Sequence, residues 1–239
     1  MTIPYIIYNN VKSSDLGLQI EQMSSIPMPV RKYQYTDIPG ADGQLVHDYG
    51  TYEDVQIEVR FNLMNMPVTA AYLNSWLTGT GTLVHSDEPT RYYIVKAVQM
   101  NTRYRSRPGG NNYDSVSAIF LCEPYRYLRN QPYIQPDSWS QWPDVYNAYN
   151  APAMPRITIS GSTKPMTITF TRSSGVSTVI VDNTAAVIDC WSHNVYIGNT
   201  NLNPATTVVG DWPVLMPGSN ILSMTNVTGI AIEPRFRDL

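Results

Sequence analysis

Charged side chains are scarce in this sequence and have no excess of one sign. They make up 15% of 239 residues, 16 basic and 19 acidic, for a formal net charge of −3. The balance is similar along the chain, with 11 basic and 12 acidic residues up to position 129 and 5 and 7 after it. Such a chain has no electrostatic basis for choosing nucleic acid or an anionic membrane as its main partner.

Patterns that carry chemistry are also missing. The three histidines, His47, His85 and His193, form no H-x-x-x-H pair, and none adjoins a cysteine. The sequence contains no phosphate-binding glycine loop, no dinucleotide fingerprint and no G-x-S-x-G nucleophile motif. We therefore expect no catalytic residue, no metal site and no cofactor, and a binding or structural role in place of an enzymatic one.

One acidic segment, DIPGADGQLVHD (37–48), has the composition of a calcium loop but not its spacing. Its acids are five and six residues apart, whereas an EF-hand places ligands at alternate positions and ends on a glutamate. We interpret Pro39, Gly40 and Gly43 as turn formers in this segment.

Long apolar runs and cysteine pairs are absent as well. No run approaches the roughly 18 apolar residues of a membrane-spanning helix, and the N-terminus lacks the pattern of a secretory signal. Cys122 and Cys190 end two apolar, strand-like segments, which favours buried free thiols over a disulfide. We expect a protein made in the cytoplasm, with no membrane anchor.

The residues that are abundant predict strands and turns: the chain has 17 tyrosines and 18 prolines. Residues 55–61, VQIEVRF, alternate between apolar and polar side chains, as a half-buried strand does. Residues 91–100 and 115–122 are apolar on both faces and flank a turn-rich stretch, so they predict a hairpin with a long tip. The first half should be an α+β domain of mostly β character.

A single helix is predicted over residues 68–77, VTAAYLNSWL. Thr69 is a candidate N-cap, and Gly79 follows as a stop signal. Tyr72, Leu73, Trp76 and Leu77 form an apolar stripe that must pack on a sheet.

The second half begins with a change of composition. Residues 131–155 hold five prolines without alternation, and we interpret 131–152 as a linker anchored on the surface by aromatic residues such as Trp139 and Trp142. Seven short alternating segments follow at spacings of about 8 to 12 residues, which is typical of an antiparallel sandwich. In MTITFT, Met166, Ile168 and Phe170 should point inward, and Trp191 should belong to the core. The predicted domains are 1–130 and 153–239.

Two surface features are candidates for contacts. Arg103, Arg105 and Arg107 share one face of an extended segment, which fits a solvated hairpin arm that resists edge pairing, a protein contact or a nucleic-acid contact. The tryptophans and tyrosines of the second half leave a carbohydrate-binding face open.

Residues 210–222, GDWPVLMPGSNIL, predict a firmly fixed chain reversal. Pro217-Gly218 suits the two central positions of a type II turn, in which the glycine takes positive φ. Trp212 and Leu215 should cover the open end of the sandwich there.

Several segments in series resemble the distal tail (Dit) proteins of long-tailed phages with flexible tails. The resemblance extends over nearly the whole chain in unbroken order and includes SSDLGLQI (13–20), IPGADGQL (38–45), YLNSWLTGTGTLVHSDEPTRYYIV (72–95), FLCEPYRY (120–127) and WPVLMPGSNIL (212–222) with IAIEPRFRDL (230–239).

This resemblance implies a fold and a set of partners. It implies an N-terminal tail-tube-like β domain with one helix, which forms a hexameric ring, and a C-terminal galectin-like sandwich that projects outward. The ring would cap the tail tube at the distal end of the virion tail and pass DNA through its channel without reading its sequence. Expected neighbours are the tail tube, tape-measure, tail-associated tip, and receptor-binding or baseplate proteins. Arg103, Arg105 and Arg107 become candidates for the subunit interface or the channel wall.

One departure from the family concerns the second domain. Its 87 residues (153–239) are few for a galectin-like module, which favours docking or structural support over direct glycan binding. Two alternatives stay open: another tail or neck component with a tube-like fold, and a free carbohydrate-binding module.

Overall fold

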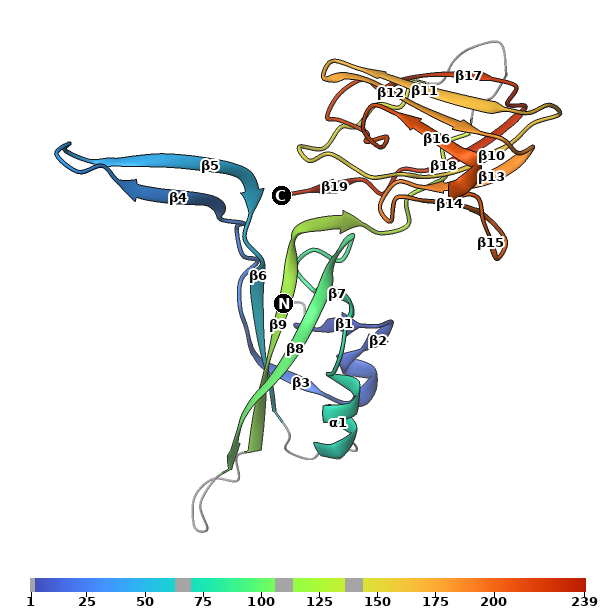
Figure 1. Cartoon of the computed structure of the whole chain (residues 1–239). Coiled ribbons are helices and arrows are strands. Elements are labelled where there is room, and N and C mark those ends of the chain that lie inside the picture. Colours follow the sequence, from blue (N-terminus) through green and yellow to red (C-terminus); the bar gives the residue numbers. More distant parts are fainter. Residues whose placement is uncertain (1–2, 63–69, 106–113, 136–143) are drawn as a thin grey trace. The chain divides into compact units, whose positions relative to one another are not determined.

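The computed structural model describes residues 3–62, 70–105, 114–135 and 144–239, and its architecture is mainly β with one short helix (Figure 1). The chain divides into two compact units: unit 1 comprises Met1–Tyr127 with Leu239, and unit 2 comprises Leu128–Asp238. The described part of the chain contains no helix with the length and apolar character that a membrane span requires. The fold class predicted from the sequence is confirmed.

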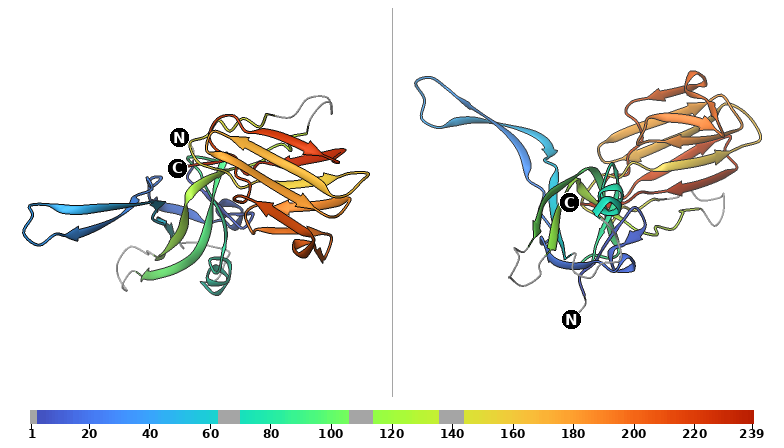
Figure 2. Two further views of the ribbon diagram at one scale, coloured as in Figure 1. Left: turned by 45° about the horizontal axis from the view of Figure 1, so that its top comes forward. Right: turned by 90° about the horizontal axis from the view of Figure 1, so that it is seen from below.

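Unit 1 is built on an antiparallel sheet that curls around its own core (Figure 2). Its strand order is β2-β1-β7-β8-β9-β6-β3, so strands far apart in the sequence are neighbours. The strands are β1 (Ile6–Tyr8), β2 (Val11–Lys12), β3 (Gln19–Met23), β6 (Val55–Asn62), β7 (Gly81–His85), β8 (Arg91–Arg105) and β9 (Asp114–Leu128). A short 3-10 turn, η1 (Ser13–Leu16), follows β2.

The alternation in β6 behaves as predicted. Val55, Ile57, Val59 and Phe61 are buried, while the residues between them are exposed or half-buried. β8 and β9 are neighbours in the sheet, as expected for the two arms of a hairpin, and the predicted tip between them lies outside the described residues.

The predicted helix forms as α1 (Ala70–Trp76), and Leu73 within it and Leu77 directly after it pack on the core. Tyr72 was expected in the same stripe but is 43% exposed, so this part of the prediction is wrong. With only seven residues, the helix presents a narrow apolar face, and Tyr72 lies outside it. Gly79 follows with φ +79, which suits a helix stop; the cap candidate Thr69 is outside the described residues.

Unit 1 also carries a two-stranded hairpin that has a sheet of its own. It pairs β4 (Arg31–Asp37) with β5 (Gln44–Tyr52), and Figure 1 shows it extending away from β6. Every residue of the two strands is exposed except Tyr52, which is half-buried. We call residues 31–52 the arm.

Unit 2 is a sandwich of two antiparallel sheets around one core. The five-stranded sheet has the order β15-β14-β13-β10-β18, and the four-stranded sheet has the order β16-β12-β11-β17. Their bounds are β10 (Arg156–Ser160), β11 (Met166–Arg172), β12 (Gly175–Val181), β13 (Ala185–Asp189), β14 (Asn194–Ile197), β15 (Thr200–Asn201), β16 (Thr206–Val209), β17 (Ile221–Thr225) and β18 (Gly229–Glu233), with η2 (Asn203–Ala205) before β16 and β19 (Arg237–Asp238) near the end of the chain.

The core of the sandwich confirms most of its predicted inward residues. Met166, Ile168 and Phe170 are each 0% exposed. Trp191 was expected in the core but is 38% exposed, because it lies in the turn between β13 and β14, beyond the strand that ends at Asp189.

The predicted linker packs along unit 2 where the structure describes it. Ile134 exchanges two backbone hydrogen bonds with Ile232 of β18, at 2.8 and 2.9 Å. Asp144 forms a bridge with Ile221 of β17, and Ala153 forms one with Leu215. Trp139 and Trp142 lie outside the described residues, and the domain limits at 130 and 153 stay a prediction.

Both cysteines are buried free thiols, as predicted. Burial raises the pKa of each to about 12, and a nearby acid, Asp54 for Cys122 and Asp189 for Cys190, adds to the effect. A thiol with so high a pKa has almost no thiolate at neutral pH and is a poor nucleophile.

Candidate interaction surface

The arm exposes apolar side chains on both of its faces. Cross-strand pairs point to the same side of an antiparallel hairpin, so Tyr33 and Tyr35 share a face with Val46, the partner of Tyr35. The rings of Tyr33 and Tyr35 are 6.4 Å apart, and Tyr35 and Val46 are 60% and 53% exposed. The same face also carries the polar residues Asp37, Gln44 and Asp48.

The opposite face of the arm combines apolar and polar groups. The rings of His47 and Tyr49 meet edge to face with centroids 4.9 Å apart, and the Tyr49 hydroxyl donates to the Gln34 side chain. Leu45 on this face is 58% exposed. An isolated two-stranded hairpin is marginally stable in water, so an arm with two uncovered apolar faces is suited to contact another surface.

An ion pair near the base of the arm and a side-chain hydrogen bond at its tip connect its two strands. Near the base, Arg31 pairs with Asp48 at 2.8 Å. The hydrogen bond from Arg31, reinforced by the backbone N–H of Gly50, holds the pKa of the Asp48 carboxyl below its usual value. At the tip, Gln44 donates to Asp37 at 2.8 Å.

The predicted turn residues Pro39, Gly40 and Gly43 form the arm tip. The Ala41 N–H donates to the Ile38 carbonyl at 3.1 Å, which closes a four-residue turn with Pro39 and Gly40 at its centre. Gly40 and Gly43 both have φ +84, a conformation that strains any other residue. These residues thus shape the end of the arm.

The candidate arginines are not part of the arm. Arg103 and Arg105 lie at the C-terminal end of β8, the strand that neighbours β9, and Arg107 lies outside the described residues. Their role at an interface or channel stays a prediction.

The segment 210–222 forms a loop fastened by one buried side chain, Asn220, which is 0% exposed. The Asn220 amide donates to the carbonyls of Met216 and Gly218 at 2.8 and 3.0 Å, and its oxygen accepts from the Met216 N–H at 2.8 Å. It also donates to the Val145 carbonyl at 3.0 Å. Four bonds from one side chain therefore tie the loop to itself and to the 144–153 segment.

The remaining predicted loop residues surround this side chain. Gly218, which follows Pro217, has φ +94 and exchanges backbone hydrogen bonds of 2.8 and 2.9 Å with Asn147. Trp212 packs partly buried against the core of unit 2, and its ring stacks on His193 at 5.0 Å. The loop is thus a structural closure of the sandwich.

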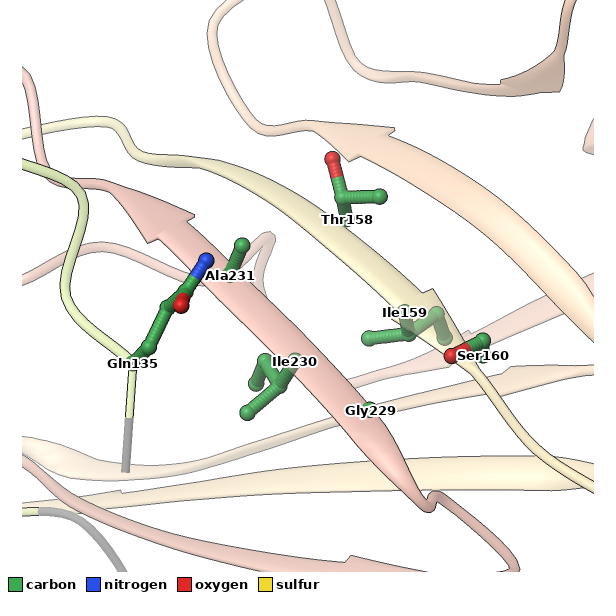
Figure 3. A pocket seen from close by; sticks show the side chains of 7 residues that line it. All are labelled: Gln135, Thr158, Ile159, Ser160, Gly229, Ile230 and Ala231. Carbon is green, nitrogen blue, oxygen red and sulfur yellow. The ribbon is translucent and has the colours of Figure 1, made fainter. Parts of the chain in front are cut away.

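A shallow groove of about 320 Å³ lies on unit 2 over β10 and β18 (Figure 3). It exists because small residues are paired there, Thr158 with Ala231 and Ser160 with Gly229, while Gln135 borders it. None of its seven lining side chains is acidic, basic or a thiol. The groove offers hydrogen bonds but no general acid or base.

Groups that hold metal ions do not gather in residues 3–62, 70–105, 114–135 or 144–239: no three histidine, cysteine, aspartate or glutamate side chains there form such a cluster. Of the histidines, His47 lies on the arm, His193 stacks on Trp212, and His85 is buried in unit 1.

Sequence reasoning missed the arm as an element. The signal was present: RKYQYTD (31–37) and QLVHDYGTY (44–52) flank a turn rich in glycine and proline, which is a hairpin pattern. The pattern shows two paired strands but not whether another layer covers them. Exposure of the arm therefore required the tertiary structure.

Comparison with known proteins is informative at the level of fold. No protein-family model and no curated protein matches the sequence. The solved structure of the Dit protein (gp 19.1) of SPP1, described as a paradigm of the hub adsorption apparatus in phages that infect Gram-positive bacteria, matches with a TM-score of 0.73. The match covers 97% of this chain and 98% of that chain at 18% sequence identity. The chain has the Dit fold, and the resemblance seen in the sequence is confirmed at that level.

Proposed function

We propose that this protein is a structural hub at the distal end of a phage tail. The observation that carries the proposal is the Dit fold over nearly the full length of both chains, including both units. A fold alone does not specify a function. Two further observations support the proposal: the sequence contains no catalytic pattern, and several exposed apolar side chains, among them Tyr35, Leu45 and Val46, lie on a projecting hairpin.

The proposed assembly is a ring of six copies. A ring needs a heterologous contact, in which one surface of a subunit meets a different surface of the next. The arm supplies one such surface, because both of its faces expose apolar side chains that no layer of unit 1 covers. We assign the arm to the contact between neighbouring copies, where it would bury Tyr35, Val46 and Leu45.

The proposed partners follow from a position at the end of the tail tube. The ring would join the tube and tape-measure proteins on one side to the tail-associated tip protein on the other. Unit 2, the galectin-like module of the sequence prediction, would carry receptor-binding or baseplate proteins. DNA would cross the channel of the ring without sequence-specific contacts, in keeping with the balanced charge of the chain.

The test of the ring is the solution mass of the full-length protein, measured by size exclusion with light scattering. Six copies of 26.9 kDa give a species of about 160 kDa. Antibody labelling of virions then separates a distal tail hub from a neck or tube component. Label at the neck, or along the tube, would contradict the proposal, as would strong saccharide binding by a protein that never joins a tail.

The arm assignment has its own test in the double variant Tyr35→Ser with Val46→Ser. Both side chains are exposed within one chain, so unfolding should be unchanged while the 160 kDa species is lost in favour of a monomer of 26.9 kDa. The matched control is Val209→Ser, which alters a 56% exposed valine of unit 2 and should leave the ring intact. A full ring in the double variant would remove the arm from the interface.

The arginine hypothesis is tested separately. Replacing Arg103, Arg105 and Arg107 by alanine should weaken ring formation or the joining of tails. Normal assembly and normal tails would exclude these residues from the interface and the channel.

A further inference from the structure

The segment that leads into the arm begins at Ser24, which is hydrogen-bonded on both sides. Ser24 is the first residue after β3, and its N–H donates to the Glu58 carbonyl of β6 at 2.9 Å. The Ser24 hydroxyl accepts from the Glu58 N–H at 3.1 Å. Ser24 is therefore hydrogen-bonded to β6 at the end of β3, before residues 25–30 lead into the arm. Ile26, within these residues, packs on the core of unit 1.

A third bond to Ser24 comes from the far side of the curled sheet. His85, the final residue of β7, donates from Nε2 to the Ser24 carbonyl at 3.1 Å. In the sheet order, β8, β9 and β6 lie between β7 and β3. The hydrogen bond therefore joins the end of β7 to the residue after β3, two strands that are not neighbours in the sheet, between residues 61 positions apart in the chain. His85 is 1% exposed, so water competes little for either partner.

The second ring nitrogen of His85 fixes the role of the first. The backbone N–H of Asp87 donates to Nδ1 at 3.1 Å, so Nδ1 must be the unprotonated acceptor. The ring hydrogen is then on Nε2, which is the arrangement needed to donate to the Ser24 carbonyl. One neutral tautomer satisfies both contacts, and neither contact belongs to a metal site or to the proposed interface.

We propose that His85 is a latch that holds the start of the segment leading into the arm against the end of β7. Without it, Ser24 keeps its two bonds to Glu58 but loses the only described tie that joins it to the opposite side of the curl. The latch sets the direction in which residues 25–30 leave the sheet. It thereby presents the arm in one orientation before any partner arrives, which lowers the entropy lost on docking.

Two substitutions separate the two ring nitrogens. In His85→Gln the side-chain amide can take the place of Nε2 and donate to the Ser24 carbonyl, whereas in His85→Asn the amide oxygen can take the place of Nδ1 and accept from Asp87. The measurement is residue-resolved amide hydrogen exchange on the full chain, read at Ser24, Glu58 and Asp87. Asn should speed exchange at Ser24 and Glu58 by about tenfold and leave Asp87 slow; Gln should do the reverse.

If hydrogen exchange at Ser24 and Glu58 is accelerated equally in both variants, or in neither, the latch proposal is wrong. His85 would then only accept the hydrogen bond from Asp87 in its own turn. The amides of Val59 and Phe120, in the core of unit 1, are the folding control. Faster hydrogen exchange at both would show that a variant unfolds. In that case the other variant is compared with wild type. Ser24→Ala is a matched variant, because it removes the hydroxyl and keeps the carbonyl that His85 uses. It should leave Asp87 exchange unchanged.

The consequence of the latch for ring formation rests on the proposed function. His85→Asn should lower the fraction of the 160 kDa species, whereas His85→Gln should retain it. The exchange measurement does not require a ring, so a protein that stays monomeric would contradict the proposed function while the latch is still decided by the exchange rates.

Discussion

Two turns in this molecule have the same Pro-Gly sequence but different surroundings. Pro39-Gly40 forms the tip of the arm, and Pro217-Gly218 lies in the loop that closes the sandwich of unit 2. Both glycines have positive φ, +84 and +94, and a Cβ atom at either would meet no atom within 4 Å. Local sequence and local geometry are therefore nearly alike.

The surroundings of the two turns differ completely. The first turn is closed by its own backbone, from the Ala41 N–H to the Ile38 carbonyl. In the second, the Met216 carbonyl accepts from the buried Asn220 amide, and Asp144 accepts from the Ser219 hydroxyl and the Asn220 N–H. One turn depends on nothing beyond itself, whereas the other is integrated into the fold of unit 2. This difference suits an arm that acts on a partner and a loop that acts on its own domain.

The largest effect should come from Asn220→Ala. The substitution leaves the buried Val145 carbonyl and the part-buried Met216 carbonyl without a donor and the Met216 N–H without an acceptor, and each such group costs about 1–3 kcal/mol. The Gly218 carbonyl keeps its hydrogen bond from the Asn147 N–H. We expect unit 2 to lose about 4 kcal/mol of unfolding free energy, measured by denaturant or thermal unfolding. Asn201→Ala is the control, because Asn201 is exposed and its side chain accepts one hydrogen bond, from the Asn203 N–H. A loss of unfolding free energy below about 1 kcal/mol in Asn220→Ala would show that the loop is stable without the hydrogen bonds of the Asn220 side chain.

A smaller effect is expected from Gly218→Val, whose cost is the positive φ forced on a β-branched residue. Unit 2 should lose about 1–3 kcal/mol, measured by thermal unfolding. The same change at the other turn, Gly40→Val, strains the arm alone, so the main unfolding transition should stay in place. Equal shifts in the two variants would remove the distinction between an independent turn and an integrated one.

The smallest effect concerns two ion pairs, one in each region. In unit 2, burial tends to raise the pKa of the Asp189 carboxyl, but Arg235 at 2.8 Å and the N–H groups of Trp191 and Ser192 outweigh it and hold the pKa below its usual value. A depressed pKa gives stability that is present above the unfolded value of about 3.9 and lost as pH falls through the folded pKa.

Asp189→Asn should therefore cost unit 2 on the order of 1 kcal/mol at pH 7, and the difference from wild type should start to shrink below about pH 4 and disappear as the pH falls through the lower folded pKa. Asp48→Asn on the arm removes a solvent-exposed ion pair with Arg31 and should leave the unfolding midpoint unchanged. A constant difference between Asp189→Asn and wild type across this pH range would show that the pair does not titrate with folding.

The sequence by itself determined the strands, the reversals and the thiols. Alternation specifies which side chains of a strand share a face, so Ile57 and Phe61 in β6 and Ile168 and Phe170 in β11 could be assigned to a core without knowing the partner strands. Gly40 and Gly218 could be placed in turns for the same reason, because φ is a local property.

Only the tertiary structure decided which faces are covered and which distant groups meet. Tyr33 and Tyr35 alternate with polar residues as core strands do, yet they are exposed, and Trp191 is exposed one residue beyond buried Cys190. Asn220 meets Val145, 75 residues away, and His85 meets Ser24, 61 residues away. Alternation repeats every two residues, so it carries no information about contacts between residues far apart in the chain. Those contacts are set by how the sheets curl and pack.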